Sequence, residues 1–207
     1  MSLDQQALYD ARLELVDYLV DALYDVPDSE FVERLLGGGL DTPDESVNDD
    51  LDRGFEFLHE FVAEHEGDDA EAVADDLNVT YTKLFVGPRP PVQPHETYFR
   101  DDTDFLSTGL AEVEASYGAA GWGDHDELSE EGDFVGVELL FVRNLIARQR
   151  AGQAEAVGFE RVFLDEHLTE WVDAFVDAVE AETDEAFYLA AVNVLAGFVE
   201  LERDLVA

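Results

Sequence analysis

The chain has 207 residues, of which 46% are hydrophobic, and a formal charge of −40 from 51 acidic and 11 basic residues. This hydrophobic content is too high for a disordered acidic tail, so we expect a folded protein with one core and an acidic surface. The absence of cysteine excludes disulfide bonds and thiolate chemistry.

The acidic residues are spread along the whole chain, and Lys83 is the only lysine. We interpret this pattern as adaptation to the molar salt of a halophilic, haloarchaeal cytoplasm, where a Debye length of about 3 Å makes the repulsion harmless. The rival interpretations are a calcium buffer, a DNA mimic and a receptor for basic ligands. No EF-hand pattern is present. The sequence starts without a secretory signal, and its longest uncharged run, residues 186–199, is shorter than the ~20 residues of a membrane span. We therefore expect a cytoplasmic protein without membrane insertion.

The first half of the chain predicts four helices, over about 2–26, 29–36, 42–67 and 69–85, each with apolar residues at intervals of three and four. Three of these helices begin with capping signals: Ser2 with Gln5, Thr42 with Pro43 and Glu45, and Asp68.

The second half predicts a helix over 106–117, an acidic, glycine-punctuated connector over 118–133 that we interpret as a hinge, and then a mostly apolar helix with Asp133 as its N-cap. Further helices are expected over 155–167, 168–180 and from 183 to the end, the last capped by Thr183. Strand alternation is almost absent. The sequence therefore predicts one all-α domain over 1–207, a bundle of about nine helices.

Enzyme motifs are largely missing: we find no nucleophile elbow, P-loop, dinucleotide fingerprint or H-E-x-x-H zinc motif. His59 and His65 are six residues apart, about 240° around a helix, so they cannot share a metal. We interpret His95, His125 and His167 as solvated or capping residues. The chain is typical of a binding protein without a cofactor, although a carboxylate pair such as Glu130 and Asp133 leaves an acid–base enzyme as an alternative.

Four of the six prolines lie within residues 88–94, between a helical pattern and the cluster His95–Phe99. Proline fixes φ and restricts the preceding residue, so the segment 87–96 is predicted to be a stiff, extended loop. Such a loop either braces a crossover or, beside exposed aromatic residues, forms a preformed groove for a flexible peptide.

The stretch "YTKLFVGPRPPVQPHETYF" resembles the signature of the TorD/DmsD family of molybdoenzyme maturation chaperones, in which Y-x-x-L-F-x-G-P precedes a proline-rich loop and an acid–hydroxyl–aromatic cluster. The stretch "EGDFVGVELLFVRNL" is similar to the start of a later family helix, E-P-D-H-x-x-x-E-L. Two C-terminal stretches, "FLDEHLTEWVDAFVDAV" and "FYLAAVNVLAGFVELE", also follow the family's order. The resemblance therefore spans nearly the whole chain.

This resemblance implies a TorD-like helical fold and a peptide-binding site at the residues that match the motifs. These residues are Tyr81, Leu84, Phe85, Pro88, Pro94, Glu96, Thr97, Tyr98, Asp133, Phe134 and Glu138. In this sequence Gly132 replaces the usual proline, Phe134 the usual histidine and Thr97 the usual serine.

The family also implies a cytoplasmic chaperone that binds a molybdopterin oxidoreductase precursor of the DMSO/TMAO reductase type, through its twin-arginine signal peptide or its apoprotein, before cofactor loading and export. The closest alternative is an assembly chaperone for the catalytic subunit of a nitrate reductase. A helical small-molecule sensor is a further alternative, but the basic DNA-binding helix of such sensors is absent, so we expect no nucleic-acid partner. The oligomeric state is open between a monomer and a dimer, in which the connector 118–133 would allow exchange of helices.

Overall fold

The computed structural model describes residues 3–40, 42–43, 45–100, 106–123 and 128–207, and within these ranges it contains helices and no strand. The predicted all-α class is confirmed. The helices are α1 (Leu3–Leu23), α2 (Ser29–Leu36), α3 (Asp49–Glu64), α4 (Ala70–Phe85), α5 (Glu96–Phe99), α6 (Leu106–Ala120), α7 (Val135–Arg150), α8 (Glu155–Phe163), α9 (Thr169–Glu182) and α10 (Ala186–Val206).

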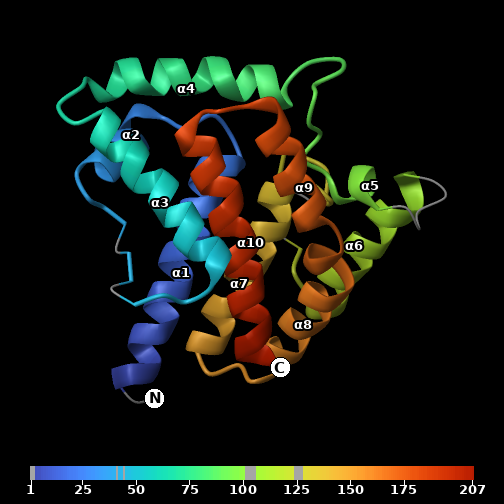
Figure 1. Ribbon diagram of the computed structural model, residues 1–207. Coiled ribbons are helices and arrows are strands. Elements are labelled where there is room, and N and C mark those ends of the chain that lie inside the picture. The colour runs from blue at the N-terminus through green and yellow to red at the C-terminus, as the bar shows by residue number, and fades with distance from the viewer. Residues whose placement is uncertain (1–2, 41, 44, 101–105, 124–127) are drawn as a thin grey trace.

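Helix α10 forms the centre of the bundle, with α3, α9 and α1 packed against it and α7 packed against α1 (Figure 1). Helix α4 lies across the end of the bundle that is opposite the labelled N- and C-termini. Nearly every residue of the uncharged run 186–199 is buried, as expected for a core helix. None of the described helices combines the length and the apolar character that crossing a membrane requires.

Two glycines allow α3 and α10 to approach each other closely. A Cβ atom added at Gly54 would lie 2.7 Å from the backbone nitrogen of Val194, and one added at Gly197 would lie 2.4 Å from that of Leu51. Real Cβ atoms essentially never come so near to backbone atoms. The crossing therefore depends on glycine in both helices.

Three helices begin at residues other than those predicted. The third helix begins at Asp49 and not at Thr42, because the side chain of Asn48 accepts a hydrogen bond from Leu51 N (2.8 Å) and donates one to Gly197 O (2.9 Å). Asp69, and not Asp68, caps α4. Glu185, and not Thr183, is the N-cap of α10. The capping box predicted at Ser2 lies outside the described residues.

Helices α8 and α9 are joined without a break by a π-helical turn, Leu164–Leu168. The sequence predicts a boundary between His167 and Leu168, inside this turn. The hydroxyl group of Thr169 donates to the carbonyl oxygen of Leu164 (2.9 Å), five residues earlier. Such π-turns within helices occur frequently at functional sites.

A buried ionic cluster connects four helices at the end of the bundle near the termini. Arg12 of α1 donates to Glu202 of α10 (Nε to Oε1, 2.9 Å), to Glu160 of α8 (Nη2 to Oε1, 3.0 Å) and to Gln149 of α7 (Nη1 to Oε1, 3.2 Å). Glu160 and Glu202 are fully buried. Burial raises the pKa of Glu160 to about 9, and the nearby carboxylate of Glu202 adds to this effect, so the two carboxyl groups hold a proton at neutral pH.

The free energy of unfolding should therefore fall as the pH rises between 4.5 and about 9, because Glu160 stays protonated in the native state and loses its proton on unfolding. One such proton contributes a slope of up to about 1.4 kcal/mol per pH unit. Denaturant titrations at pH 5.5 to 8.5 in molar KCl would measure this slope. Glu160→Gln should reduce the slope by up to about 1.4 kcal/mol per pH unit, the contribution of one proton, whereas identical slopes in the two proteins would show that Glu160 does not hold the proton.

Candidate functional site

The proline-rich loop is fixed to the beginning of α7 by backbone hydrogen bonds. Val135 N donates to Pro94 O (2.9 Å), Glu96 N donates to Asp133 O (2.9 Å), and His95 forms an isolated antiparallel bridge with Phe134. The loop and the segment before α7 therefore form one unit, although nearly 40 residues separate them in the sequence.

Asp133 connects these two segments and does not cap α7. Its Oδ1 atom lies 3.0 Å from Nδ1 of His95, and its Oδ2 atom accepts hydrogen bonds from the hydroxyl group (2.5 Å) and the amide (3.4 Å) of Thr97. The N-cap of α7 is Phe134, which makes no capping bond through its side chain. The predicted capping role of Asp133 is wrong, because the donors from the loop take both of its oxygens. Burial would raise the pKa of Asp133, but the bonds from His95 and Thr97 outweigh it and hold the pKa below its ordinary value.

Replacing Asp133 by serine should lower the free energy of unfolding by about 1.5–3 kcal/mol, the usual contribution of a hydrogen bond to a charged group, because a serine side chain does not reach both partners. Asp28→Ser is the matched control. Asp28 is exposed and does cap its helix, accepting from Phe31 N (2.8 Å), and serine caps a helix as well as aspartate does. Thermal and denaturant melts of both variants would test the difference. Equal, small losses of stability in the two variants would indicate that Asp133 contributes no more than a helix cap does.

Glu96 is a second buried acid of the site, and it has two cationic or proton-donating partners. Arg100 donates to its Oε1 atom (2.5 Å), and Nδ1 of His167 lies 3.0 Å from its Oε2 atom. The other ring nitrogen of His167 lies 3.0 Å from the hydroxyl oxygen of Ser116 in α6. The π-helical turn thus brings His167 into the interior, where it connects the short helix α5 to α6.

The sequence interpretation missed both histidines of the site. His167 is 2% exposed and hydrogen-bonded on both ring nitrogens, so its assignment as a solvated or capping residue is wrong. His95 contacts Asp133, and His125 lies outside the described residues. Only Arg100 could have been found from local spacing, as the i, i+4 partner of Glu96.

His59 and His65, which lie outside this site, have different polar partners. The ring of His59 contacts the hydroxyl group of Thr42, and the ring of His65 contacts the carboxylate of Asp68.

Glu138 is the third buried acid, and it lies in the first turn of α7. Trp171 of α9 donates its indole N–H to Oε2 (3.3 Å), whereas Oε1 has no hydrogen-bond partner among the described residues. Burial raises the pKa of Glu138 well above its ordinary value, and the negative charge of Glu96 raises it further. The raised pKa favours the neutral, protonated form of Glu138, so burial opposes a third full charge in the interior.

The predicted aromatic residues lie mostly in the core. Tyr81, Leu84 and Phe134 are buried, and Phe85 is half-buried. Tyr81 and Phe85 pack against Tyr188 of α10, with ring centroids 6.3 and 6.0 Å away. These residues therefore support the loop from the core. A peptide could contact the buried side chains of Tyr81, Leu84 and Phe134 only after a rearrangement of the fold.

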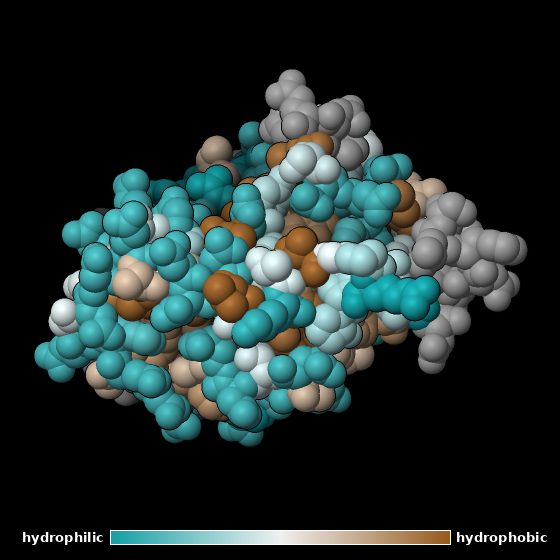
Figure 2. Space-filling model, turned by 90° about the horizontal axis from the view of Figure 1, so that it is seen from above, coloured by the Kyte–Doolittle hydropathy of each residue, from teal (hydrophilic) through white to brown (hydrophobic). Residues whose placement is uncertain are grey.

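Two of the predicted residues, Pro88 and Tyr98, are exposed. Tyr98 is 51% exposed and Val86, at the end of α4, is 52% exposed. Figure 2 looks onto the α4 side of the molecule, where hydrophilic side chains cover most of the surface and small hydrophobic groups emerge between them. The accessible part of the predicted peptide site is therefore the outer surface of the loop with Tyr98.

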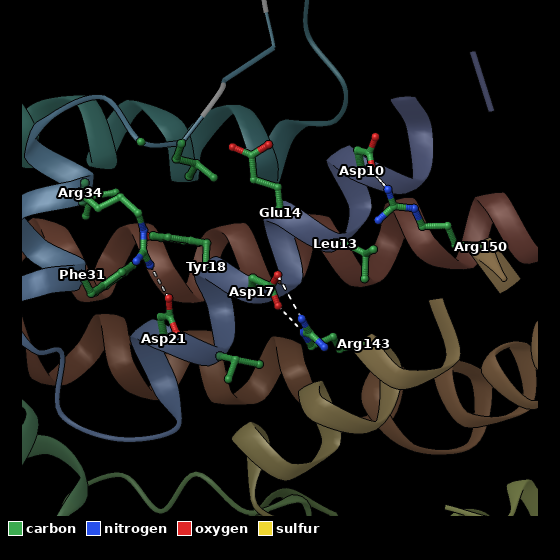
Figure 3. Close-up of a pocket in the computed structure, with 14 residues that line it drawn as sticks. Asp10, Leu13, Glu14, Asp17, Tyr18, Asp21, Phe31, Arg34, Arg143 and Arg150 are labelled. Carbon is green, nitrogen blue, oxygen red and sulfur yellow. Dashed lines mark hydrogen bonds and ion pairs between the residues drawn. The ribbon is translucent and has the colours of Figure 1, made fainter. Parts of the chain in front are cut away.

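A separate cavity of about 590 Å³ lies between α1, α2 and α7 (Figure 3). Its rim carries three ion pairs, Asp10 with Arg150, Asp17 with Arg143 and Asp21 with Arg34. Its lining includes the buried ring of Tyr18, whose hydroxyl group has no hydrogen-bond partner among the described residues. None of the residues predicted for the peptide site lines this cavity.

Comparisons with known proteins agree with the resemblance seen in the motifs. The chain is 27% identical over 137 residues to a protein of Photobacterium profundum named Chaperone protein TorD, in an alignment that covers 61% of this chain and 62% of the relative. The chain therefore matches less than two thirds of that relative's length. No solved structure shows a significant match. The model of the nitrate reductase delta subunit family matches residues 45–177, which include the proline-rich loop and the beginning of α7, and the chain belongs to this family.

Proposed function

We propose that the protein is a cytoplasmic maturation chaperone that binds the precursor of a molybdopterin oxidoreductase, through its twin-arginine signal peptide or its apoprotein, before cofactor loading and export. The observation that supports it best is the convergence of both motif segments, 94–98 and 133–138, on one buried network within a chain of this family. The similarity to a protein named as a chaperone agrees with it. A chaperone of this kind is a binding protein, and no catalysis is part of the proposal.

The network gives the proposed site its stiffness. Because Asp133 and Glu96 hold residues 95–100 from inside, Tyr98 is presented on a backbone that does not have to become ordered when a peptide binds. A guanidinium group can stack on an exposed aromatic ring and pair with nearby carboxylates, and the acidic surface would select such a basic peptide. Apolar contact would then supply most of the affinity in high salt.

Calorimetric titration in 2 M KCl would test this site with a twin-arginine peptide that includes its apolar segment, and with a version carrying lysine in place of both arginines. We expect binding of the first peptide, and a loss of at least fivefold in affinity for Tyr98→Ala. Leu205→Ala serves as the control, because Leu205 is also exposed but lies near the C-terminus, at the other end of the bundle. The absence of binding of either peptide in high salt would contradict a signal-peptide site.

The family description gives an alternative client, the catalytic subunit of a nitrate reductase. Affinity purification from native cytoplasm at high salt distinguishes the two clients by mass spectrometry. A twin-arginine precursor of the DMSO/TMAO reductase type supports the first proposal, and a nitrate reductase subunit supports the alternative. Recovery of a small metabolite without either enzyme would favour a sensor and contradict both.

We also propose that the acidic surface is an adaptation to molar salt in a halophilic, haloarchaeal host. With a charge of −40, mutual repulsion opposes the compact state in dilute buffer and is screened at high ionic strength. The melting temperature, followed by circular dichroism, should rise strongly between 0.1 and 2 M KCl, and cooperativity should weaken at the low end. A melting temperature independent of salt would contradict this adaptation.

The oligomeric state is a further part of the proposal, as a monomer or as a dimer with exchanged helices at the hinge 118–133. The hydroxyl group of Tyr117 donates to Gly132 O (2.6 Å), so the two ends of the segment meet within one chain. Gel filtration with light scattering in 2 M KCl would distinguish the two states.

A further inference from the structure

We propose that His95, Glu131 and Asp133 form a binding site for a divalent transition-metal ion such as zinc. One ligand atom from each of these residues lies within 4.8 Å of the other two. An imidazole nitrogen with carboxylate oxygens is a donor set that zinc and its neighbours in the first transition series bind well. The proposal does not require peptide binding, although Asp133 also belongs to the predicted peptide site, and nothing in the family comparison indicates a metal.

The fold brings the three ligands together from two distant segments. Glu131 and Asp133 lie in one turn, closed by a hydrogen bond from Phe134 N to Glu131 O (3.1 Å). His95 reaches them through its bridge with Phe134. The site therefore exists only in the folded protein, so binding of the ion would stabilise the native state.

Two of the ligands already have the spacing of a coordination sphere. Nδ1 of His95 and Oδ1 of Asp133 are 3.0 Å apart, and ligand atoms at about 2.0–2.2 Å from a tetrahedral zinc ion are separated by about 3.3 Å. The ion would take the place of the proton that these two atoms now share. Glu131 is exposed, so a change of its side-chain rotamer can bring its carboxylate closer to the other two ligand atoms.

The surroundings of the site resemble the supporting shell of a metal centre. Asp133 is 2% exposed, and its other oxygen is held by Thr97, which orients the carboxylate from behind. The ring of His95 packs against those of Phe134 and Tyr98, with centroids 5.4 and 6.2 Å away. Three protein ligands leave at least one coordination position for water, as in open zinc sites.

The nature of the donors determines which ions should bind. Magnesium and calcium prefer six or more oxygen ligands and carry little affinity for imidazole, so they should bind weakly here. The other 49 acidic residues of the chain attract any divalent cation, but molar KCl screens this nonspecific attraction. Measurements in 2 M KCl therefore distinguish specific binding at the three ligands from nonspecific attraction to the acidic surface.

The test is titration of the full chain with Zn²⁺ in 2 M KCl against a chromophoric metal indicator, together with the absorption spectrum of the Co²⁺ form and the melting temperature. We expect one equivalent of Zn²⁺ to bind with a raised melting temperature, and visible Co²⁺ bands of a four- or five-coordinate site. Glu131→Gln should weaken Zn²⁺ binding by at least tenfold, and His95→Gln should abolish it. Glu130→Gln, a change of the same chemistry at the neighbouring exposed position, should have no effect.

Circular dichroism of Glu131→Gln without metal checks that the fold is intact, as we expect for a substitution of an exposed side chain. Equal Zn²⁺ affinity of the Glu131→Gln and Glu130→Gln proteins would overturn the proposal, and so would equal affinity of the native protein for Mg²⁺ and Zn²⁺. No peptide is present in these experiments, so either result would contradict only the metal site and would not test the chaperone proposal.

Discussion

Replacing Gly197 by alanine should lower the free energy of unfolding by about 2–3 kcal/mol, near the upper end of the usual cost of overpacking a core. The new Cβ atom would lie 2.4 Å from the backbone nitrogen of Leu51 and 2.7 Å from Oδ1 of Asn48. The backbone of α3 has to move, because the nitrogen of Leu51 is a backbone atom and the side chain of Asn48 is held by two hydrogen bonds. The movement would also disturb the side chain that caps α3 and donates to Gly197 O.

Gly158→Ala is the matched control for this experiment. Gly158 lies within α8, and a Cβ atom added there meets nothing within 4 Å. Alanine is the better helix former, so this variant should be neutral or more stable by up to about 1 kcal/mol. Denaturant titrations of both variants in molar KCl give the comparison. A Gly197→Ala protein as stable as the native one would mean that α3 and α10 are less tightly packed than described.

Replacing Arg12 by methionine should cost about 3–5 kcal/mol, the effect seen when one partner of a buried ion pair is removed. Methionine keeps much of the volume of the side chain but removes all hydrogen bonds to Glu202, Glu160 and Gln149. The remaining carboxylate charge between the two fully buried glutamates would then have no counter-ion.

Arg143→Met tests whether this loss comes from burial. Arg143 pairs with Asp17 on the surface, where both side chains are almost half exposed, so its removal should cost less than about 1 kcal/mol. In the double variant Arg12→Met with Glu202→Gln, the unpaired charge is removed as well, and part of the lost stability should return. If the Arg12 and Arg143 variants lost equal stability, the buried cluster would contribute no more than a surface pair.

Most of the helices could be predicted from local patterns, although α3 begins later in the chain than expected and the short helix α5 was not predicted. The second helix occupies residues 29–36 as expected, and the uncharged run of α10 is the buried centre of the bundle. These features depend on apolar residues at intervals of three and four and on caps within a few residues, all of which lie close together in the sequence. The same local motifs indicated the family, because Glu96, Thr97, Asp133 and Glu138 can be recognised from their neighbours in the chain.

The sequence by itself thus determined the all-α class, the core helices and the residues of the motif. Their partners were decided by the tertiary structure. Glu96 meets His167 across 71 residues, and Arg12 meets Glu202 across 190. A buried charge takes whichever donor the packing of other helices brings near it, and no local pattern encodes that choice. For the same reason Asp133, which has the sequence position of a helix cap, instead holds the proline-rich loop through His95 and Thr97.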